Sequence, residues 1–289
     1  MLRTIAAMNR PRLAGVVNAM RIQPTSQRMW MSAAGSIKHR HEYQPVPWSV
    51  RGVDMSVDLR EETATVTTKP TLRRQRSAAG AGSIVLDAEN LEILSVKVDG
   101  TPTANFTATA DTLCISDVPR HEDDFIVETV VRIEPAKNTQ LSGMYQAGPM
   151  ILTQCEAEGF RRITPYFDRP DVMAPFKCRI EADESFPILL SNGNKVSAGS
   201  LPGSRHFAVW EDPYKKPAYL FALVAGDLGS LRSSFKTASG RDVALEIFCE
   251  RQNTPKLSHA MGCLKSAMEC AATLQAVQPR RAVPPFRPM

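Results

Sequence analysis

Residues Thr153–Arg161 read Thr-Gln-Cys-Glu-Ala-Glu-Gly-Phe-Arg, and they decide how the rest of the chain is interpreted. Gly143-Met144-Tyr145 precedes this stretch, and Tyr166–Val172 (Tyr-Phe-Asp-Arg-Pro-Asp-Val) and Leu190–Asn194 (Leu-Ser-Asn-Gly-Asn) follow it. On composition alone, a Gln-x-Glu triplet at residues 154–156 is an ordinary pair of polar residues on a surface loop. The order and spacing of the four segments together favour a functional role for this triplet.

In this order and spacing, the four segments resemble the N-terminal domain of zinc aminopeptidases of the aminopeptidase N (alanyl aminopeptidase) family. The resemblance covers residues 42–270 and is strongest over residues 143–260. It implies a saddle-like β-sandwich packed on a thermolysin-like catalytic domain. It also implies a zinc-dependent reaction that removes neutral or basic residues from the N-termini of peptides.

The resemblance assigns substrate-binding roles to two residues of the Thr153–Arg161 stretch. Glu156 would hold the ammonium group of the peptide N-terminus, and Gln154 would orient the N-terminal residue in its side-chain pocket. These roles fit elementary chemistry, because a cation that leaves water needs charged and hydrogen-bonded oxygen partners. The neighbouring charged residues are predicted to fix this loop through ion pairs or caps: Arg161, Arg162, Asp168, Arg169 and Asp171.

Period-two alternation of apolar and polar residues predicts a mainly β chain. The alternating segments are Val53–Leu59, Phe125–Ile133 and Phe176–Ile180. Asp99-Gly100 and Asn192-Gly193 predict tight turns, since both pairs tolerate the positive φ of hairpins. Thr68–Ser83, rich in Arg, Gly and Ala, is predicted to be a loop. Residues 42–236 are therefore expected to form the β-sandwich domain.

A different pattern begins near residue 237. Val243, Leu245 and Ile247 predict one more strand, and a helix is expected to follow, with Thr254 as N-cap and Pro255 at its first position. Apolar residues at helical spacing then form one face: Leu257, Met261, Leu264 and Met268. We interpret residues 237–278 as the start of an incomplete catalytic domain, whose apolar helix face could mediate association. The Pro/Arg-rich residues 279–289 are expected to be a disordered tail.

The net charge of +5 is concentrated at the N-terminus. Residues 1–41 carry seven basic residues and no acidic residue, which leaves 28 basic and 30 acidic residues in the remainder. This distribution argues against nucleic-acid binding. A basic leader of this composition predicts a disordered mitochondrial targeting segment, with a cytoplasmic location as the alternative. No stretch is long and apolar enough to predict a transmembrane segment, and the six cysteines are expected to be free thiols.

A zinc aminopeptidase of this kind needs a His-Glu-x-x-His helix, and this chain has no such motif. His121-Glu122 is the nearest match, but Phe125 occupies the second histidine position. Ala267-Met268-Glu269-Cys270 is only a partial match to the Gly-x-Met-Glu-Asn motif of the family. We therefore expect no metal site, no bound cofactor and no peptidase activity in this chain alone, with zinc belonging to the full-length family enzyme.

Two hypotheses follow for the function. The first is that the chain is the N-terminal portion of a zinc aminopeptidase, truncated before the zinc motif, and that this portion binds peptide N-termini. The alternative is a stand-alone β-sandwich binding module without peptidase activity.

Overall fold

The computed structural model describes residues 39–75, 82–116, 118, 119, 121 and 123–277, without the side chains of residues 273–277. Most of the predicted leader and all of the predicted tail therefore lie outside the described residues. The chain divides into two compact units, residues 1–44 and residues 45–289. The described part of the first unit contains the short 3-10 helix η1 (Arg40–Glu42). The second unit contains everything that follows.

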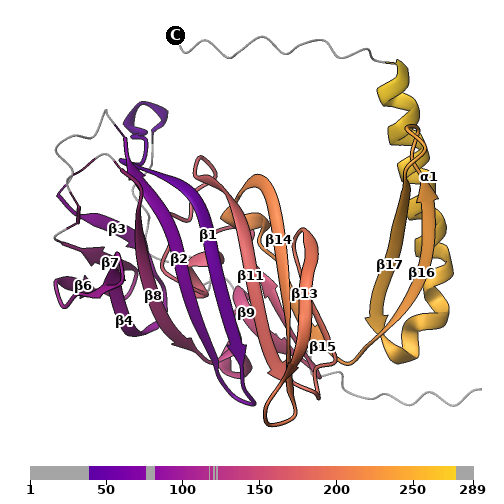
Figure 1. The fold of residues 1–289 in the computed structure, drawn as a ribbon, viewed down its shortest axis with the longest axis horizontal. Helices are drawn as coiled ribbons and strands as arrows, with labels where there is room; N and C mark the ends of the chain where they lie inside the picture. The colour runs from indigo at the N-terminus through magenta and orange to yellow at the C-terminus, as the bar shows by residue number, and fades with distance from the viewer. Residues whose placement is uncertain (1–38, 76–81, 117, 120, 122, 278–289) are drawn as a thin grey trace, which may run out of the picture. The chain divides into compact units, whose positions relative to one another are not determined.

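An eight-stranded sheet forms the largest layer of the second unit (Figure 1). In spatial order its strands are β13 (Asn194–Leu201), β14 (Arg205–Pro217), β11 (Met173–Asp183), β1 (Trp48–Leu59), β2 (Ala64–Arg74), β8 (Phe125–Ile133), β4 (Glu92–Val98) and β5 (Thr101–Pro102). The pairing is antiparallel except between β1 and β11, which run parallel. A parallel pair requires a long crossover connection, and the chain between these two strands contributes strands to both layers.

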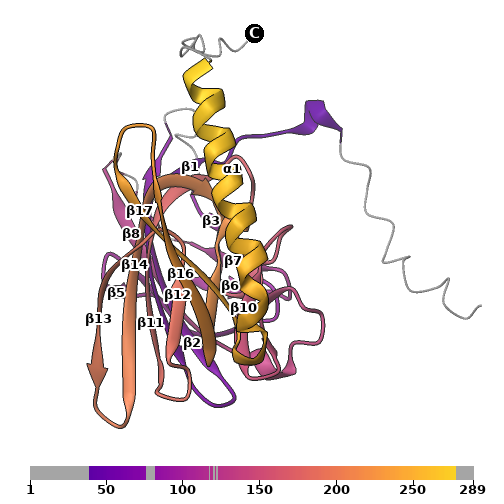
Figure 2. The same cartoon turned by 90° about the vertical axis from the view of Figure 1, so that its right-hand side faces the viewer.

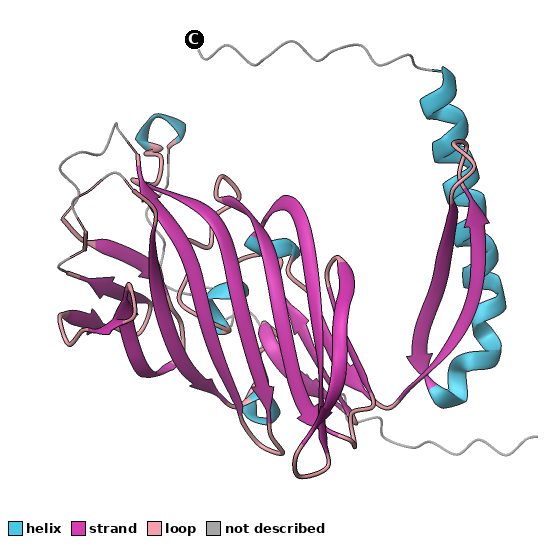
Figure 3. Ribbon diagram, in the orientation of Figure 1, coloured by secondary structure: helices cyan, strands magenta, loops and turns pink. Residues whose placement is uncertain are grey.

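Two smaller sheets form that second layer, on one side of the large sheet (Figure 2). One consists of β12 (Ile188–Ser191), β15 (Leu223–Gly226), β10 (Met150–Gln154) and β9 (Gly143–Ala147). The other consists of β3 (Ile84–Asp87), β7 (Thr112–Ile115) and β6 (Phe106–Ala108). Short 3-10 helices lie in the connections: η3 (Pro135–Lys137), η4 (Phe160–Arg162) and η5 (Ala218–Leu220). Strands dominate the described chain, as the alternating sequence pattern predicts (Figure 3).

One hydrophobic core lies between the layers and draws side chains from all three sheets. Met55 and Val57 of β1, Leu113 of β7 and Leu223 of β15 are fully buried in it. Trp48 meets Phe125 edge to face, with ring centroids 5.5 Å apart. This packing confirms the predicted β-sandwich.

The residues after Thr68 differ from the sequence prediction, which placed a loop over 68–83. Strand β2 continues to Arg74, where the guanidinium carbon lies 4.5 Å from the centre of the Trp48 ring. Thr68 itself is fully buried. The polar residues of this segment are typical of a loop, but about half of them face solvent from a regular strand, as alternation allows.

The Asn192-Gly193 turn forms as predicted, with positive φ at Gly193, but it does not close a hairpin. The strands on either side, β12 and β13, belong to different sheets, so the turn carries the chain from one layer to the other. Asn192 holds the turn in place by donating to the Leu220 carbonyl at 3.0 Å and accepting from the Ala222 N–H at 2.7 Å. By contrast, Asp99-Gly100 connects paired strands β4 and β5, as predicted, and both residues have positive φ.

The solvent face of the large sheet carries a row of alternating charges, which we call the charge ladder. Neighbouring strands place its members side by side: Lys97, Glu128, Lys69, Asp54, Lys177 and Glu211. Glu128 bridges two lysines, with oxygens 2.8 Å from Lys97 Nζ and 2.9 Å from Lys69 Nζ. Opposite charges on directly facing strands stabilise a sheet.

The two lysines hold the pKa of Glu128 below its usual range, first through the hydrogen bond from Lys97 and then through that from Lys69. A carboxylate with a lowered pKa in the folded state adds stability above its ordinary pKa and loses it as the pH falls through the folded value. We expect Glu128→Gln to lower the free energy of unfolding by about 1 kcal/mol near neutral pH. Urea unfolding at neutral and acidic pH measures this difference.

In acid, below the lowered pKa, the wild type and Glu128→Gln should have the same stability. Glu92→Gln is the matched control, because Glu92 pairs with Arg132 at 3.2 Å on the same sheet but is 57% exposed. It should change stability little at either pH. A deficit of Glu128→Gln that persists unchanged in acid would contradict the electrostatic explanation.

The chain after the sandwich forms a hairpin and a helix (Figure 1). Strands β16 (Leu228–Lys236) and β17 (Asp242–Glu250) pair only with each other within the described chain. The 3-10 helix η6 (Arg251–Lys256) and then α1 (Leu257–Val277) follow, and α1 packs on both strands. The predicted strand at 243–247 is thus β17, while its partner β16 lies before residue 237. The proposed boundary at 237 therefore stays a prediction.

The start of the helix also differs in detail from the prediction. Thr254 and Pro255 lie inside η6, and the α-helix begins at Leu257. Leu257 and Met261 are buried, while Leu264 and Met268 are half-buried. The hairpin therefore covers the first half of the predicted apolar face. None of the described helices is both long enough and apolar enough to cross a membrane.

Candidate functional site

Gln154 and Glu156 lie together on the turn that follows β10. Strand β10 ends at Gln154, and the N–H of Gly159 closes the turn by donating to the Cys155 carbonyl at 2.8 Å. The Gln154 side chain donates through Nε2 to the main-chain carbonyl of Glu156 at 2.9 Å. The peptide bond between Glu156 and Ala157 is cis. Both predicted site residues are exposed to solvent.

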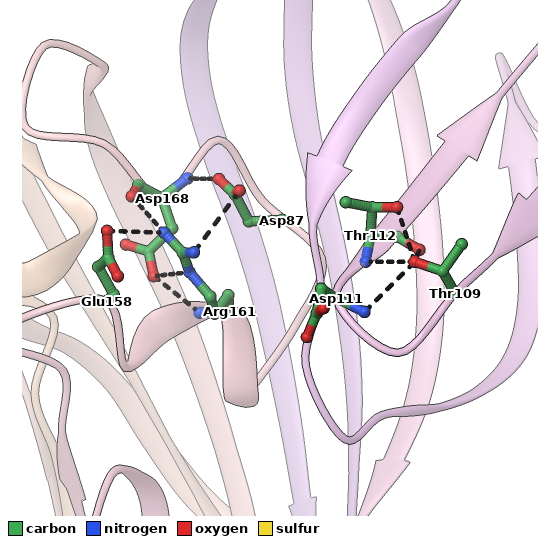
Figure 4. Close-up of polar contacts among 7 residues, drawn as sticks. All are labelled: Asp87, Thr109, Asp111, Thr112, Glu158, Arg161 and Asp168. Atoms are coloured by element: carbon green, nitrogen blue, oxygen red, sulfur yellow. Dashed lines mark hydrogen bonds and ion pairs between the residues drawn. The ribbon is translucent and has the colours of Figure 1, made fainter. Parts of the chain in front are cut away.

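The two glutamates of this turn have different surroundings. Glu158, with φ of 65°, places a carboxylate oxygen 3.5 Å from Nη2 of Arg161 (Figure 4). The Glu156 carboxylate makes no hydrogen bond or ion pair with any residue in the described part of the chain. Glu156 is therefore the glutamate of this turn whose carboxylate has no partner among the described residues.

Arg161 and Asp168 form a part-buried ion pair directly behind this turn (Figure 4). The Asp168 carboxylate accepts from the Arg161 main-chain N–H at 3.0 Å and from Arg161 Nε at 3.2 Å. Nη2 of Arg161 also donates to the Asp168 carbonyl at 3.0 Å. The Asp168 side chain is only 3% exposed, and this burial raises its pKa although the Arg161 donors favour the charged form. These contacts confirm that the charged residues here fix the loop.

A segment distant in sequence completes this support. The Asp87 carboxylate at the end of β3 accepts from the Asp168 N–H at 3.0 Å and lies 3.7 Å from Nη1 of Arg161. Glu89 accepts from the guanidinium of Arg162. Sequence alone does not predict a role for either acid, because 73 or more residues separate them from their partners. No local pattern marks such a long-range pairing.

The β6–β7 turn holds the segment around Asp87 through a main-chain hydrogen bond, and Figure 4 shows the contacts that close this turn. The Thr109 hydroxyl accepts from the N–H groups of Asp111 at 3.3 Å and Thr112 at 3.0 Å. This closes the turn and leaves the Asp111 carbonyl to accept from the Ala88 N–H at 2.9 Å. A threonine hydroxyl commonly stabilises a tight turn in this manner. Hydrogen bonds of Asp168 and Asp87 thus support the site loop directly, and those of the β6–β7 turn support the segment around Asp87.

Two glycines allow the chain to pass closely beneath the turn. A Cβ on Gly159 would lie 2.8 Å from Cys155 Cα and 3.0 Å from the Gly143 nitrogen. Gly143 has φ of +80°, and a Cβ there would lie 2.7 Å from Arg162 Cβ. Side chains at either position would push the turn away from β9. This explains why glycines occur at positions 143 and 159.

Aromatic packing anchors the turn to the core on its inner side. Phe160 is fully buried and meets Tyr166, Phe176 and Phe221 at centroid distances of 5.2, 5.9 and 5.3 Å. Cys155 is also buried, and burial raises the pKa of its thiol to about 12. The thiol is therefore protonated at neutral pH and is not a nucleophile. The polar groups that this turn exposes are therefore its hydrogen-bonding oxygen atoms.

The described residues do not fit the zinc site that the sequence resemblance implies for a complete enzyme. They contain no group of three His, Cys, Asp or Glu side chains arranged to hold a metal ion. Glu269 and Cys270 of the partial motif lie within α1 and are exposed. We therefore derive no zinc-dependent step from this chain.

Comparisons with known proteins agree with this architecture. The Peptidase M1 N-terminal domain model matches residues 41–220. The chain is 44% identical to aminopeptidase N of Caulobacter vibrioides over 230 residues, and 41% identical to aminopeptidase N of Escherichia coli over 240 residues. These matches cover 79% and 83% of the chain but 26% and 27% of the relatives. The chain thus spans about a quarter of the length of these relatives.

Solved structures show the same fold. Aminopeptidase A of Legionella pneumophila, in complex with aspartic acid, superposes with a TM-score of 0.76 at 31% identity, covering 80% of this chain and 27% of that one. An M1 zinc metallopeptidase of Deinococcus radiodurans gives 0.60 at 16% identity, over 70% of this chain and 47% of that one, which shows the fold alone. From the matching domain, the relatives and the sandwich with its Thr153–Arg161 turn, we conclude that the chain belongs to the M1 peptidase family and contains its N-terminal domain.

Proposed function

We propose that this chain is the substrate-recognition domain of a zinc aminopeptidase and that its Gln154–Glu156 turn binds the free amine of peptide substrates. The observation that carries the proposal is the contrast between Glu156 and Glu158. Glu158 is engaged by Arg161, whereas the exposed Glu156 carboxylate has no partner within the described residues. Zinc and the hydrolytic step would belong to another domain, since the matched residues cover only 26% and 27% of the relatives.

The hydrogen bond from Gln154 also supports the proposal that this turn binds a free amine. Because its Nε2 donates to the Glu156 carbonyl, its Oε1 remains as an acceptor beside the turn. A carboxylate and an amide oxygen are the partners that a primary ammonium group prefers, since it only donates hydrogen bonds. The rigid support from Arg161 and Asp168 holds the turn in one conformation before the ligand arrives, which reduces the entropic cost of binding.

Glu156→Ala should weaken the binding of a free-amine peptide by about 2 kcal/mol, which corresponds to roughly 30-fold in Kd. The loss arises because the ammonium group no longer has a carboxylate partner. NMR titration of the purified chain with an alanyl peptide, following the amides of residues 154–159, measures this effect. In a polypeptide that also carries the catalytic domain, the same change should raise KM for an alanyl arylamide.

Glu158→Ala is the matched control, because it removes a neighbouring carboxylate that is already paired with Arg161. It should leave peptide binding within a few-fold of the wild type. The N-acetylated peptide should not perturb the turn, because it lacks the ammonium group. Equal effects of the two substitutions, or equal binding of both peptides, would rule out amine recognition by Glu156.

The alternative, a stand-alone binding module, uses the same turn. The intact mass of the endogenous polypeptide, captured with an antibody against residues 42–236, separates the two. A mass several times that of this chain supports the aminopeptidase, and a mass equal to it supports the module.

A further inference from the structure

The exposed face of α1 carries an imidazole and a thiol one helical turn apart. His259 and Cys263 are spaced i and i+4, and both are exposed. His259 Nε2 lies 3.5 Å from Cys263 Sγ. The helix is the long one drawn in yellow (Figure 2). The opposite side of the same helix contains the buried Leu257 and Met261, so packing does not require the His–Cys pair.

This separation fits two ligands of one metal ion. Zinc binds a thiolate sulfur at about 2.3 Å and an imidazole nitrogen at about 2.0–2.1 Å, with tetrahedral angles. Two such ligands are about 3.6 Å apart by that geometry. The observed 3.5 Å therefore needs almost no movement of either side chain. Residues at i and i+4 of a helix face the same side, which keeps both ligands aligned.

We propose that His259 and Cys263 form a two-residue site for a borderline divalent ion of the Zn²⁺ type. On binding, the thiol releases its proton to solvent and the thiolate and the neutral imidazole each donate an electron pair to the ion. Water fills the remaining positions, since the described chain brings no third His, Cys, Asp or Glu ligand to the pair. The site is thus open, and its function would be to bind a metal reversibly rather than to hold the fold together.

Cys270 provides an internal control. It is exposed on the same helix, seven residues beyond Cys263. At 1.5 Å rise per residue it lies about 10 Å further along the axis, which is too far to share the ion. Substitution of Cys270 therefore removes an exposed thiol of the same helix without removing a proposed ligand.

Cobalt titration of the purified chain under reducing conditions tests the proposal. Co²⁺ replaces Zn²⁺ in tetrahedral sites, and its thiolate complexes absorb in the near ultraviolet. We expect a saturable charge-transfer band that is absent in Cys263→Ser and unchanged in Cys270→Ser. His259→Gln should weaken binding by more than about tenfold, the smallest loss typical of groups that merely support a ligand.

Circular dichroism of each variant provides the folding check, and all three should match the wild type because the substituted side chains are exposed. Saturation at one ion per chain supports the site as described. Saturation at one ion per two chains, with the same variant pattern, supports the pair as ligands and adds a second copy. No saturable band, a band that survives Cys263→Ser, or equal loss in Cys270→Ser would overturn the proposal.

Discussion

Phe160→Ala should lower the free energy of unfolding by about 4 kcal/mol, within the range measured for large aromatic side chains in protein cores. Phe160 is fully buried between Tyr166, Phe176 and Phe221, so its removal leaves a cavity that the three remaining rings cannot close. Urea unfolding followed by tryptophan fluorescence measures the loss. Because the cavity lies directly behind the Gln154–Glu156 turn, peptide binding should weaken as well.

Tyr214→Ala is the control for ring deletion, because Tyr214 is 80% exposed. It should change stability by no more than about 0.5 kcal/mol, as is usual for surface substitutions. A loss below about 1 kcal/mol for Phe160→Ala would mean that the surrounding rings repack, and the aromatic cluster would then not be what fixes the turn.

Asp168→Ala should lower the free energy of unfolding by about 3 kcal/mol. The substitution leaves the Arg161 guanidinium, which is 19% exposed, and the Arg161 main-chain N–H without their nearest acceptor. Removing one member of a buried pair is more damaging than the pair's net contribution, because the remaining charge stays partly desolvated. Asp87 and Glu158 remain 3.7 and 3.5 Å from Arg161, which limits the loss.

Asp124→Ala removes the same side chain from an exposed ion pair, whose partner Arg73 lies 2.6 Å away. It should lower stability by less than about 1 kcal/mol. Thermal or urea unfolding of both variants makes the comparison. Similar losses for the two would show that burial of the Arg161–Asp168 pair adds nothing, and would remove it as the support of the turn.

The β-sandwich could be predicted because strands with one buried face reveal themselves by alternation. Strands β1 and β8 follow this pattern over their predicted ranges. Local sequence does not predict which strands pair when that pairing depends on distant parts of the chain. Asn192-Gly193 has the chemistry of a hairpin turn, but only the tertiary structure places its flanking strands in different sheets.

The substrate-binding roles of Gln154 and Glu156 follow from the family resemblance and stay a prediction. The structure shows that the two residues lie on one turn and are joined by a 2.9 Å hydrogen bond. Sequence alone could not show that Glu158 is engaged or that Asp87 supports Arg161, because both depend on how distant segments meet. The His-Glu-x-x-His pattern does not identify the pair His259 and Cys263, because that pattern requires a second histidine.

The charge ladder limits which single charge substitutions this sheet can accept. Each interior member faces two neighbours of opposite sign, so reversing a single charge, such as that of Lys69 between Asp54 and Glu128, creates two repulsions at once. Reversing the sign of every member would restore all the attractions. The sign that is favourable at any one position therefore depends on the signs along the whole row.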